Sequence, residues 1–451
     1  MESMRGLLIL FLILIFGGNV AFAYELVLPK EKKSVVNTKY AFFIGKVDPS
    51  ERLTINDEKI YTAQNGAFAH SVKLKEGENR ILIKSNFNTQ VYKIYKEEQI
   101  NCTESTLEEF EAKAYAVKND NTPLRKTPHD CGMNRLSHLF KGTQLLVNGS
   151  KGNFYRVFLS ETKEAWIAKD AVKPTENICP VPVFTTMNSK TYSNASLHAI
   201  EFTGKLPYTI EEDDNEILFK IYNPFYSSNS VYTINVKKPK KYTYTVKLTE
   251  GLYDFKLNHL PTNETNNLEN LVITIDAGHG GSEKGAIGCL GDNEKDINLK
   301  IAQELKPMLE QMGATVVMTR EGDANISLEE RVKIASDNCT NIFISIHLNS
   351  IPDIPMNIHK NKGTSVYYYN PNSKDLAKSV KDSLTNTINT RDDGVRNASF
   401  AVIRPSNYIG ILVETAYMTN PNDSVLYTKP DFPYNTAKGI AEGIFNFVVQ
   451  E

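Results

Sequence analysis

The chain has 451 residues, of which 41% are apolar and 23% are charged. Domains usually hold about 100–200 residues, so we expect several domains and exclude a single small one. The composition also excludes a largely disordered chain and a polytopic membrane protein. The 51 basic and 53 acidic residues leave a net charge of -2, which argues against nucleic acid as a partner because phosphate backbones select a strongly positive face.

Residues 1–23 have the pattern of a cleavable signal peptide. A short basic leader precedes an apolar run from Leu7 to Phe16, and the small residues Ala21 and Ala23 suit a signal peptidase. The run is ~10 residues long, shorter than the roughly 20 that span a bilayer. We therefore expect export to the periplasm or the extracellular cell wall, with no membrane span after cleavage.

Five cysteines are too few for a disulfide-dense scaffold. In an oxidising compartment Cys131 can pair with Cys179, or Cys289 with Cys339. The sequence leaves this pairing open, and the odd number leaves at least one free thiol.

Three stretches of short strands precede the last part of the chain. Their apolar and polar residues alternate, and turn formers such as Asp48-Pro49 separate the runs. An asparagine-rich segment follows, and because it has few apolar side chains to bury, we predict that it is a linker. The predicted β-rich modules span residues 24–100, 108–176 and 180–258, and the linker spans residues 259–270.

Residues 271–451 show a different pattern, in which predicted strands alternate with predicted helices. The continuous apolar run 271–275 is typical of a buried strand, apolar residues recur at helical spacing from Glu294, and Ser327 caps a helix with Glu330 three residues later. This alternation predicts an α/β domain with a mostly parallel sheet covered by helices on both faces. Further strands are expected at 315–318, 342–346, 363–369, 400–403 and 410–413, and further helices at 373–389 and 434–449.

Four side chains with catalytic chemistry stand near the expected strand ends, where ligands gather in such a sheet. His279 follows the first strand, His347 follows the strand at 342–346, and Glu414 ends the last strand. Glu294 opens a helix. Two imidazoles and one carboxylate match a catalytic zinc site with an open fourth position, which leaves Glu414 for proton transfer.

A single histidine after a strand is usually an ordinary core or surface residue. Two such histidines, together with two glutamates that the topology brings to the same edge, favour a metal site instead. The remaining histidines lack this setting and are expected at the surface; they are His70, His129, His138, His198, His259 and His359.

A series of short motifs runs through the α/β part: Ile275–Gly281, Gly285–Gly288, Glu294–Leu299, Thr319-Arg320, Leu328–Arg331, Ser345–Asn349 and Leu412–Thr415. In order and spacing they resemble the zinc-dependent N-acetylmuramoyl-L-alanine amidases with an AmiC-like catalytic domain, over about residues 271–450. The resemblance implies that His279, Glu294 and His347 bind Zn²⁺ and that Glu414 is the catalytic glutamate. It also implies that peptidoglycan is cut between N-acetylmuramic acid and L-alanine, for cell-wall remodelling or daughter-cell separation.

The three front modules carry looser resemblances. Residues 24–100 resemble bacterial immunoglobulin-like sandwiches, residues 108–176 a bacterial Src-homology-3-type barrel, and residues 180–258 the amidase N-terminal (AMIN) sandwich. These resemblances imply contacts with the cell wall or the division site. Two other functions stay open: a zinc peptidase that cuts the stem peptide or the cross-link, and a catalytically inert wall-binding scaffold.

Overall fold

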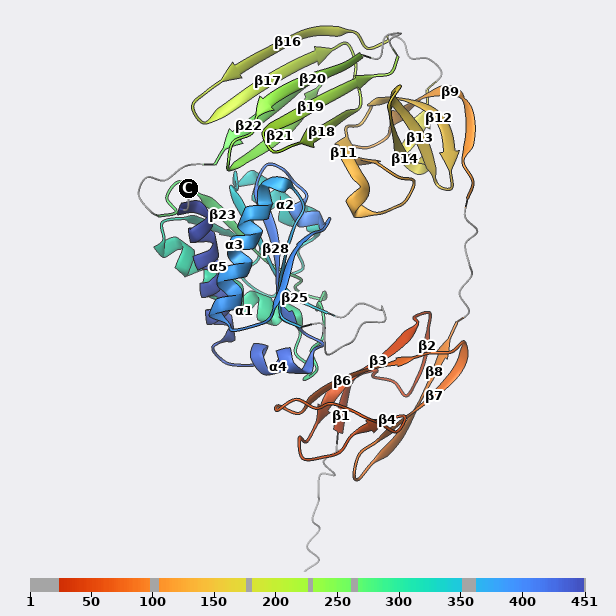
Figure 1. The fold of residues 1–451 in the computed structure, drawn as a ribbon, viewed down its shortest axis with the longest axis vertical. Helices are drawn as coiled ribbons and strands as arrows, with labels where there is room; N and C mark the ends of the chain where they lie inside the picture. Colours follow the sequence, from red (N-terminus) through yellow and green to blue (C-terminus); the bar gives the residue numbers. More distant parts are fainter. Residues whose placement is uncertain are drawn as a thin grey trace, which may run out of the picture.

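The computed structural model describes residues 24–97, 105–175, 181–225, 230–260, 267–350 and 362–449. The predicted signal peptide, residues 261–266 of the predicted linker, and Cys179 lie outside these residues. Figure 1 shows an α/β region in the middle, with residues 24–97 at one end of the molecule and the other β-rich regions at the opposite end.

Residues 24–97 form two sheets, with strand orders β1-β3-β6 and β2-β8-β7-β4-β5. Alternating residues of both sheets, including Phe43, Phe68 and Ile83, share one hydrophobic core. The strands are β1 (Tyr24–Leu28), β2 (Lys33–Val36), β3 (Tyr40–Val47), β4 (Thr54–Ile55), β5 (Glu58–Lys59), β6 (Ala67–Lys73), β7 (Gly77–Lys84) and β8 (Thr89–Lys96).

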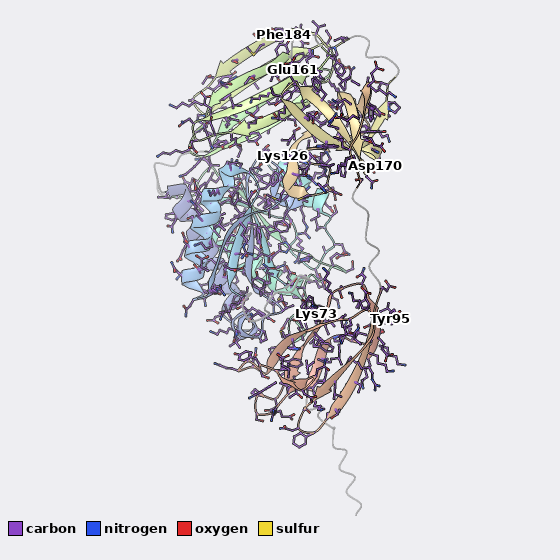
Figure 2. All side chains as sticks on the ribbon, turned by 45° about the vertical axis from the view of Figure 1, so that its right-hand side comes forward. Lys73, Tyr95, Lys126, Glu161, Asp170 and Phe184 are labelled. Atoms are coloured by element: carbon purple, nitrogen blue, oxygen red, sulfur yellow. The ribbon has the colours of Figure 1, made fainter. Side chains whose placement is uncertain are left out.

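The second region is one seven-stranded sheet in the order β11-β10-β14-β13-β12-β9-β15. In Figure 2, Lys126 and Asp170 belong to this region, whereas Lys73 and Tyr95 belong to the first. Its elements are β9 (Glu108–Val117), β10 (Thr122–Arg125), η1 (Gly132–Asn134), β11 (Arg135–Leu139), β12 (Gln144–Lys151), β13 (Phe154–Ser160), β14 (Lys163–Ala168), η2 (Lys169–Ala171) and β15 (Val172–Pro174).

The third region packs a four-stranded sheet, β16-β17-β22-β21, against a three-stranded sheet, β18-β19-β20. Aromatic rings fill the space between them, and the rings of Phe219 and Phe255 stack at 5.2 Å. The strands are β16 (Phe184–Thr191), β17 (Ala195–Phe202), β18 (Tyr208–Glu212), β19 (Glu216–Asn223), β20 (Ser230–Lys237), β21 (Tyr242–Thr249) and β22 (Leu252–His259).

Hydrophobic contacts join the regions. The buried residues of the second and third regions form a single cluster, in which the ring of Phe140 stacks on that of Tyr208. At the other end, Ile44 and Ala67 of the first region pack with Cys289 and Tyr417 of the α/β region. The second and third regions therefore share one core, while the first region joins the α/β region through a smaller contact.

A six-stranded sheet, β24-β23-β25-β28-β26-β27, forms the centre of the α/β region. β26 is antiparallel to β28, and all the other pairings in this sheet are parallel. The strands are β23 (Val272–Ala277), β24 (Thr315–Met318), β25 (Ile342–Asn349), β26 (Thr364–Tyr368), β27 (Asp392–Asn397) and β28 (Ile409–Tyr417).

Helices lie on both faces of this sheet. Alternate residues of β25 point to opposite sides, so Ile344 packs with α1, α3 and α5, whereas Phe343 packs with α2 and η4. The helices are α1 (Glu294–Gln311), α2 (Leu328–Asp337), η3 (Pro371–Ser373), α3 (Lys374–Thr387), η4 (Ala401–Ile403), α4 (Pro421–Tyr427) and α5 (Phe432–Val449). The predicted cap of α2 is confirmed, since Ser327 Oγ accepts from Glu330 N at 3.1 Å.

Several local predictions are wrong. The strand expected at 400–403 is the 3₁₀ helix η4, and the edge strand is instead β27, whose polar sequence gives no apolar alternation. The sequence leaves the cysteine pairing open, and Cys131, Cys289 and Cys339 are free thiols. His198 is buried, and its ring bonds to the hydroxyls of Ser189 and Ser196.

Within the described part of the chain, no helix is long and apolar enough to cross a membrane.

Candidate metal centre

Adjacent strands bring the predicted site residues to one edge of the sheet. β23 and β28 both pair with β25, and His347 of β25 lies directly opposite Glu414 of β28. His279 follows β23 by two residues, and Glu294 is the first residue of α1. Since the strands run parallel, their carboxyl ends meet at this edge.

His279, Glu294 and His347 converge on one point. Each offers one ligand atom, and these atoms all lie within 4.8 Å of one another. His347 Nδ1 lies 2.9 Å from Glu294 Oε1, and His279 Nε2 lies 3.2 Å from Glu294 Oε2. The structure therefore brings together the three residues that the sequence singled out as metal ligands. We call this set the His-Glu-His triad.

Glu294 is held as a carboxylate inside this cluster. Its side chain is only 5% exposed, and Ala286 N and Leu348 N donate to its two oxygens at 2.8 and 3.1 Å. Burial alone raises the pKa of Glu294, but the hydrogen bonds and charges of the two histidines outweigh it and hold the pKa well below its ordinary value. The start of α1 also favours a negative charge there.

Two glycines leave room for the ligands. A Cβ on Gly278 would lie 2.3 Å from the ring of His347, and one on Gly285 would lie 2.5 Å from Glu294 Oε2. His279 itself has φ 60°, a left-handed conformation that costs a non-glycine residue free energy. The surrounding structure must therefore hold its backbone in place.

A buried ionic network supplies this support, and sequence reasoning assigned no role to its members. Arg331 donates to Asp276 Oδ1 at 2.5 Å and to the carbonyl oxygen of His279 at 2.8 Å. Asp276 also accepts from Thr319 and Ser345. Arg320 donates to the carbonyl oxygen of Gly278 at 3.0 Å. The one signal in the sequence is Asp276, an acid within a strand whose other residues are apolar except for Thr274.

Glu414 completes the site from the neighbouring strand. Its Oε2 atom is buried and has no hydrogen-bond partner among the described residues. Burial raises the pKa of Glu414 to about 8; the charge of His347 opposes this shift and that of Glu294 adds to it. A carboxyl group in this state can exchange a proton near neutral pH.

The donor set fits a divalent metal. Two imidazoles and one carboxylate are the chemistry of a catalytic zinc site. Glu294 is fixed by backbone donors, as ligands of a preformed site require. A divalent transition metal such as zinc is therefore the kind of cation that these residues suit.

Comparisons with known proteins bear on the α/β region. A family profile described as N-acetylmuramoyl-L-alanine amidase matches residues 273–446. The germination-specific N-acetylmuramoyl-L-alanine amidase of Bacillus subtilis is 30% identical over 202 residues, which cover 41% of this chain and 82% of that relative. The N-acetylmuramoyl-L-alanine amidase LytC of the same species is 36% identical over 194 residues, which cover 41% of this chain but only 38% of LytC. A solved structure of amidase AmiC2 from Nostoc punctiforme has 36% identity and a TM-score of 0.38, covering 40% of this chain and 98% of that one.

Proposed function

Because the chain belongs to the family of N-acetylmuramoyl-L-alanine amidases, we propose that it hydrolyses the amide bond between N-acetylmuramic acid and L-alanine in peptidoglycan. The observation that carries this proposal is the convergence of the His-Glu-His triad beside Glu414, whose buried Oε2 atom has no hydrogen-bond partner among the described residues. A structural role alone gives no reason to bury an acid without a partner at that point.

His279, Glu294 and His347 would hold a zinc ion. When bound, zinc acts as a Lewis acid toward a carbonyl oxygen and makes a water-derived nucleophile available at neutral pH. The carboxylate of Glu294 offsets the charge of the metal, and its backbone donors keep its oxygens in place.

Glu414 carries the protons of the reaction. As a carboxylate it takes a proton from the attacking water while the oxygen of that water bonds to the amide carbon. The carbon–nitrogen bond then breaks, and the carboxylic acid gives the proton to the departing L-alanine nitrogen. One group thus serves as base and then as acid, and the proton count balances.

The compartment and the front regions belong to the same proposal. A peptidoglycan substrate requires export, for which the sequence predicts a signal peptide in residues 1–23. We propose that the immunoglobulin-like, Src-homology-3-like and AMIN-like modules hold the enzyme against the cell wall or the division site. Remodelling of the wall or separation of daughter cells would follow from cutting peptides off the glycan strands.

Mass spectrometry of purified muropeptides tests the proposal, with protein of measured zinc content. We expect release of peptides that carry a free L-alanine amine, and loss of this release after treatment with a chelator. Products in which shortened peptides stay attached to sugar would show a peptidase instead. Zinc-loaded protein that releases nothing while still binding peptidoglycan would support the inert scaffold.

A further inference from the structure

A second pocket lies at the opposite edge of the α/β sheet from the His-Glu-His triad. It has a volume of about 760 Å³ and is lined by residues of the second, third and α/β regions. Ser406, on its wall, precedes β28, and Glu414 lies five residues after Ile409, the first residue of that strand. At 3.3 Å per residue, the backbone of Ile409 lies about 17 Å from that of Glu414.

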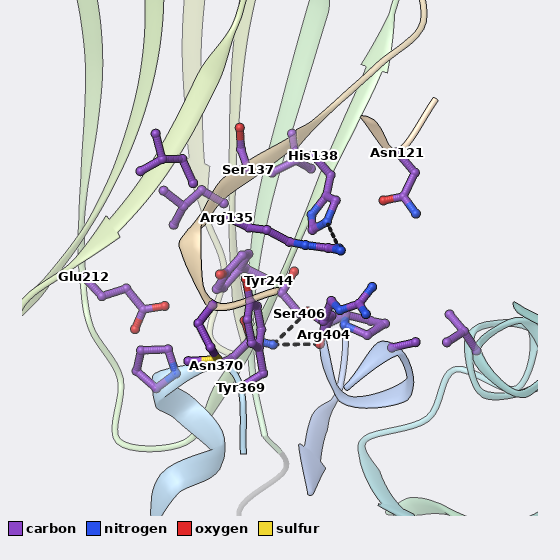
Figure 3. A pocket seen from close by; sticks show the side chains of 18 of the residues that line it. Asn121, Arg135, Ser137, His138, Glu212, Tyr244, Tyr369, Asn370, Arg404 and Ser406 are labelled. Atoms are coloured by element: carbon purple, nitrogen blue, oxygen red, sulfur yellow. Dashed lines mark hydrogen bonds between the residues drawn. The ribbon is translucent and has the colours of Figure 1, made fainter. Parts of the chain in front are cut away.

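Hydrogen bonds between the regions build the walls of this pocket. Tyr244 N of the third region donates to Ser406 O at 2.8 Å. Tyr208 OH donates to His138 O of the second region at 2.9 Å. The pocket therefore exists only where three separate parts of the chain meet, as Figure 3 shows.

Guanidinium groups give the pocket an excess of positive charge. Arg135 and Arg404 both line it, and neither forms an ion pair within the described ranges of the chain. A third, Arg125, lies close enough to affect both, but it is paired with Asp130 at 2.5 Å. Burial and the other two arginines lower the pKa of Arg135 below its ordinary value.

His138 adds a neutral acceptor to this set rather than another charge. Burial and the neighbouring arginines lower its pKa to about 4, so the ring is uncharged at neutral pH. Its Nε2 atom lies 3.0 Å from Arg135 Nη1, an interaction drawn in Figure 3.

Two buried donor groups in the same pocket have no partner in the described structure: Arg135 Nε and Ser137 Oγ. Buried polar atoms in folded proteins are nearly always bonded, so each such exception calls for an explanation. A ligand that displaces the atoms now covering Arg135 Nε would bring it an acceptor. This observation is independent of the charge, and it points to the same kind of ligand.

We propose that this pocket binds a carboxylate-bearing peptide, namely the stem peptide of peptidoglycan held away from the cleavage site. Arginine forks bind carboxylates through paired hydrogen bonds, and the half-buried ring of Tyr369 on the pocket wall offers apolar surface to a peptide. Glu212 and Glu329 also line the pocket and would repel a continuous polyanion such as a polyphosphate chain. The choice of peptidoglycan as the source of the peptide rests on the proposed function.

Equilibrium binding of free stem peptide to the full chain tests this proposal. The chain carries Glu414→Gln so that a peptidase activity, if present, does not cut the peptide during the measurement. We expect Arg135→Gln and Arg404→Gln to raise the dissociation constant roughly tenfold each, with Arg404→Lys in between because lysine keeps the charge but loses the fork. The matched control is Arg52→Gln with Arg80→Gln, which removes two exposed guanidinium groups of the first region and should leave the constant unchanged.

Three results would overturn the proposal. The first is a change of less than twofold in the dissociation constant of folded Arg135→Gln and Arg404→Gln proteins. The second is an equal rise of the dissociation constant in the control. The third is tighter binding of polyglycerol phosphate than of the peptide. Thermal melts establish folding, and if a glutamine variant melts early, Arg404→Lys carries the test. Arginine-dependent binding by the Glu414→Gln chain, together with a zinc-loaded parent chain that releases no peptide from muropeptides, would sustain this inference while the proposed function fails. Amidase activity without arginine-dependent binding would support the proposed function and overturn this inference.

Discussion

The two edges of the α/β sheet differ in how their sites are assembled. At the carboxyl edge, the His-Glu-His triad and Glu414 all come from residues 279–414 and converge through strand register and the start of α1. At the other edge, Arg135 and Arg404 meet only because the second region docks onto the α/β region. The first site is therefore a property of one domain, whereas the second depends on how the regions pack.

The chemistry of the two edges is also opposite. The carboxyl edge gathers carboxylates and imidazoles, which suit a cation. The other edge gathers Arg135, Arg404 and Lys126 against Glu212 and Glu329, and this small positive excess suits an anion.

The largest effect is expected from removing a ligand at the carboxyl edge. His347→Ala should lose zinc from the purified protein and lower amide hydrolysis by roughly a thousandfold, since the Lewis acid supplies several kcal/mol. Metal analysis and muropeptide assays measure both effects. His129→Ala, an exposed histidine of the second region, is the control and should change neither. Zinc retained at full occupancy in His347→Ala would remove this residue from the metal centre.

Glu414→Gln should leave the zinc content intact and lower the hydrolysis rate by about 10²–10³-fold, because an amide cannot carry the proton. The comparison of zinc content with rate separates this residue from the ligands. Glu310→Gln, an exposed glutamate of α1, is the matched control. A rate within tenfold of the parent would exclude Glu414 as the proton carrier.

The buried network under the metal centre comes next. Arg331→Met leaves Asp276 without its guanidinium partner, which should lower the unfolding free energy by about 3–5 kcal/mol and zinc affinity by roughly 10–100-fold. Calorimetry and a zinc competition assay measure the two effects. On the same helix, Lys333→Met breaks an exposed pair with Asp337 and should cost less than about 1 kcal/mol. Equal effects of the two changes would contradict the role assigned to Arg331.

At the opposite edge, His138 should make stability depend on pH. Its folded pKa of about 4 lies below the ordinary 6.5, so the unfolded chain binds more protons between these values and stability falls as pH drops from 6.5 toward 4. The loss at pH 4 is about 3 kcal/mol, and above pH 6.5 it vanishes. Denaturation of His138→Gln over this range should show a flatter acid slope than the parent. Parallel slopes would show that the ring is not buried as a neutral group.

Much of the α/β region could be predicted from sequence because its signals are local. The apolar run that becomes β23, the helical spacing of α1 and the Ser327 cap depend on neighbours within a few residues. The prediction of a strand at 400–403 was wrong because the local pattern of a segment does not record which segment pairs with β26. Edge strand β27 is polar and makes its hydrogen bonds to β26, so its pairing leaves no apolar pattern in its own residues.

The sequence by itself predicted that His279, His347 and Glu414 meet at one edge of the sheet, because the carboxyl ends of parallel strands lie together. Only the tertiary structure decided that Arg331 and Asp276 hold the backbone of His279. It alone placed Arg135 beside Arg404, 269 positions later in the chain. The physical reason is that side-chain hydrogen bonds and docking between regions depend on distances in space, which residue spacing along the chain does not encode.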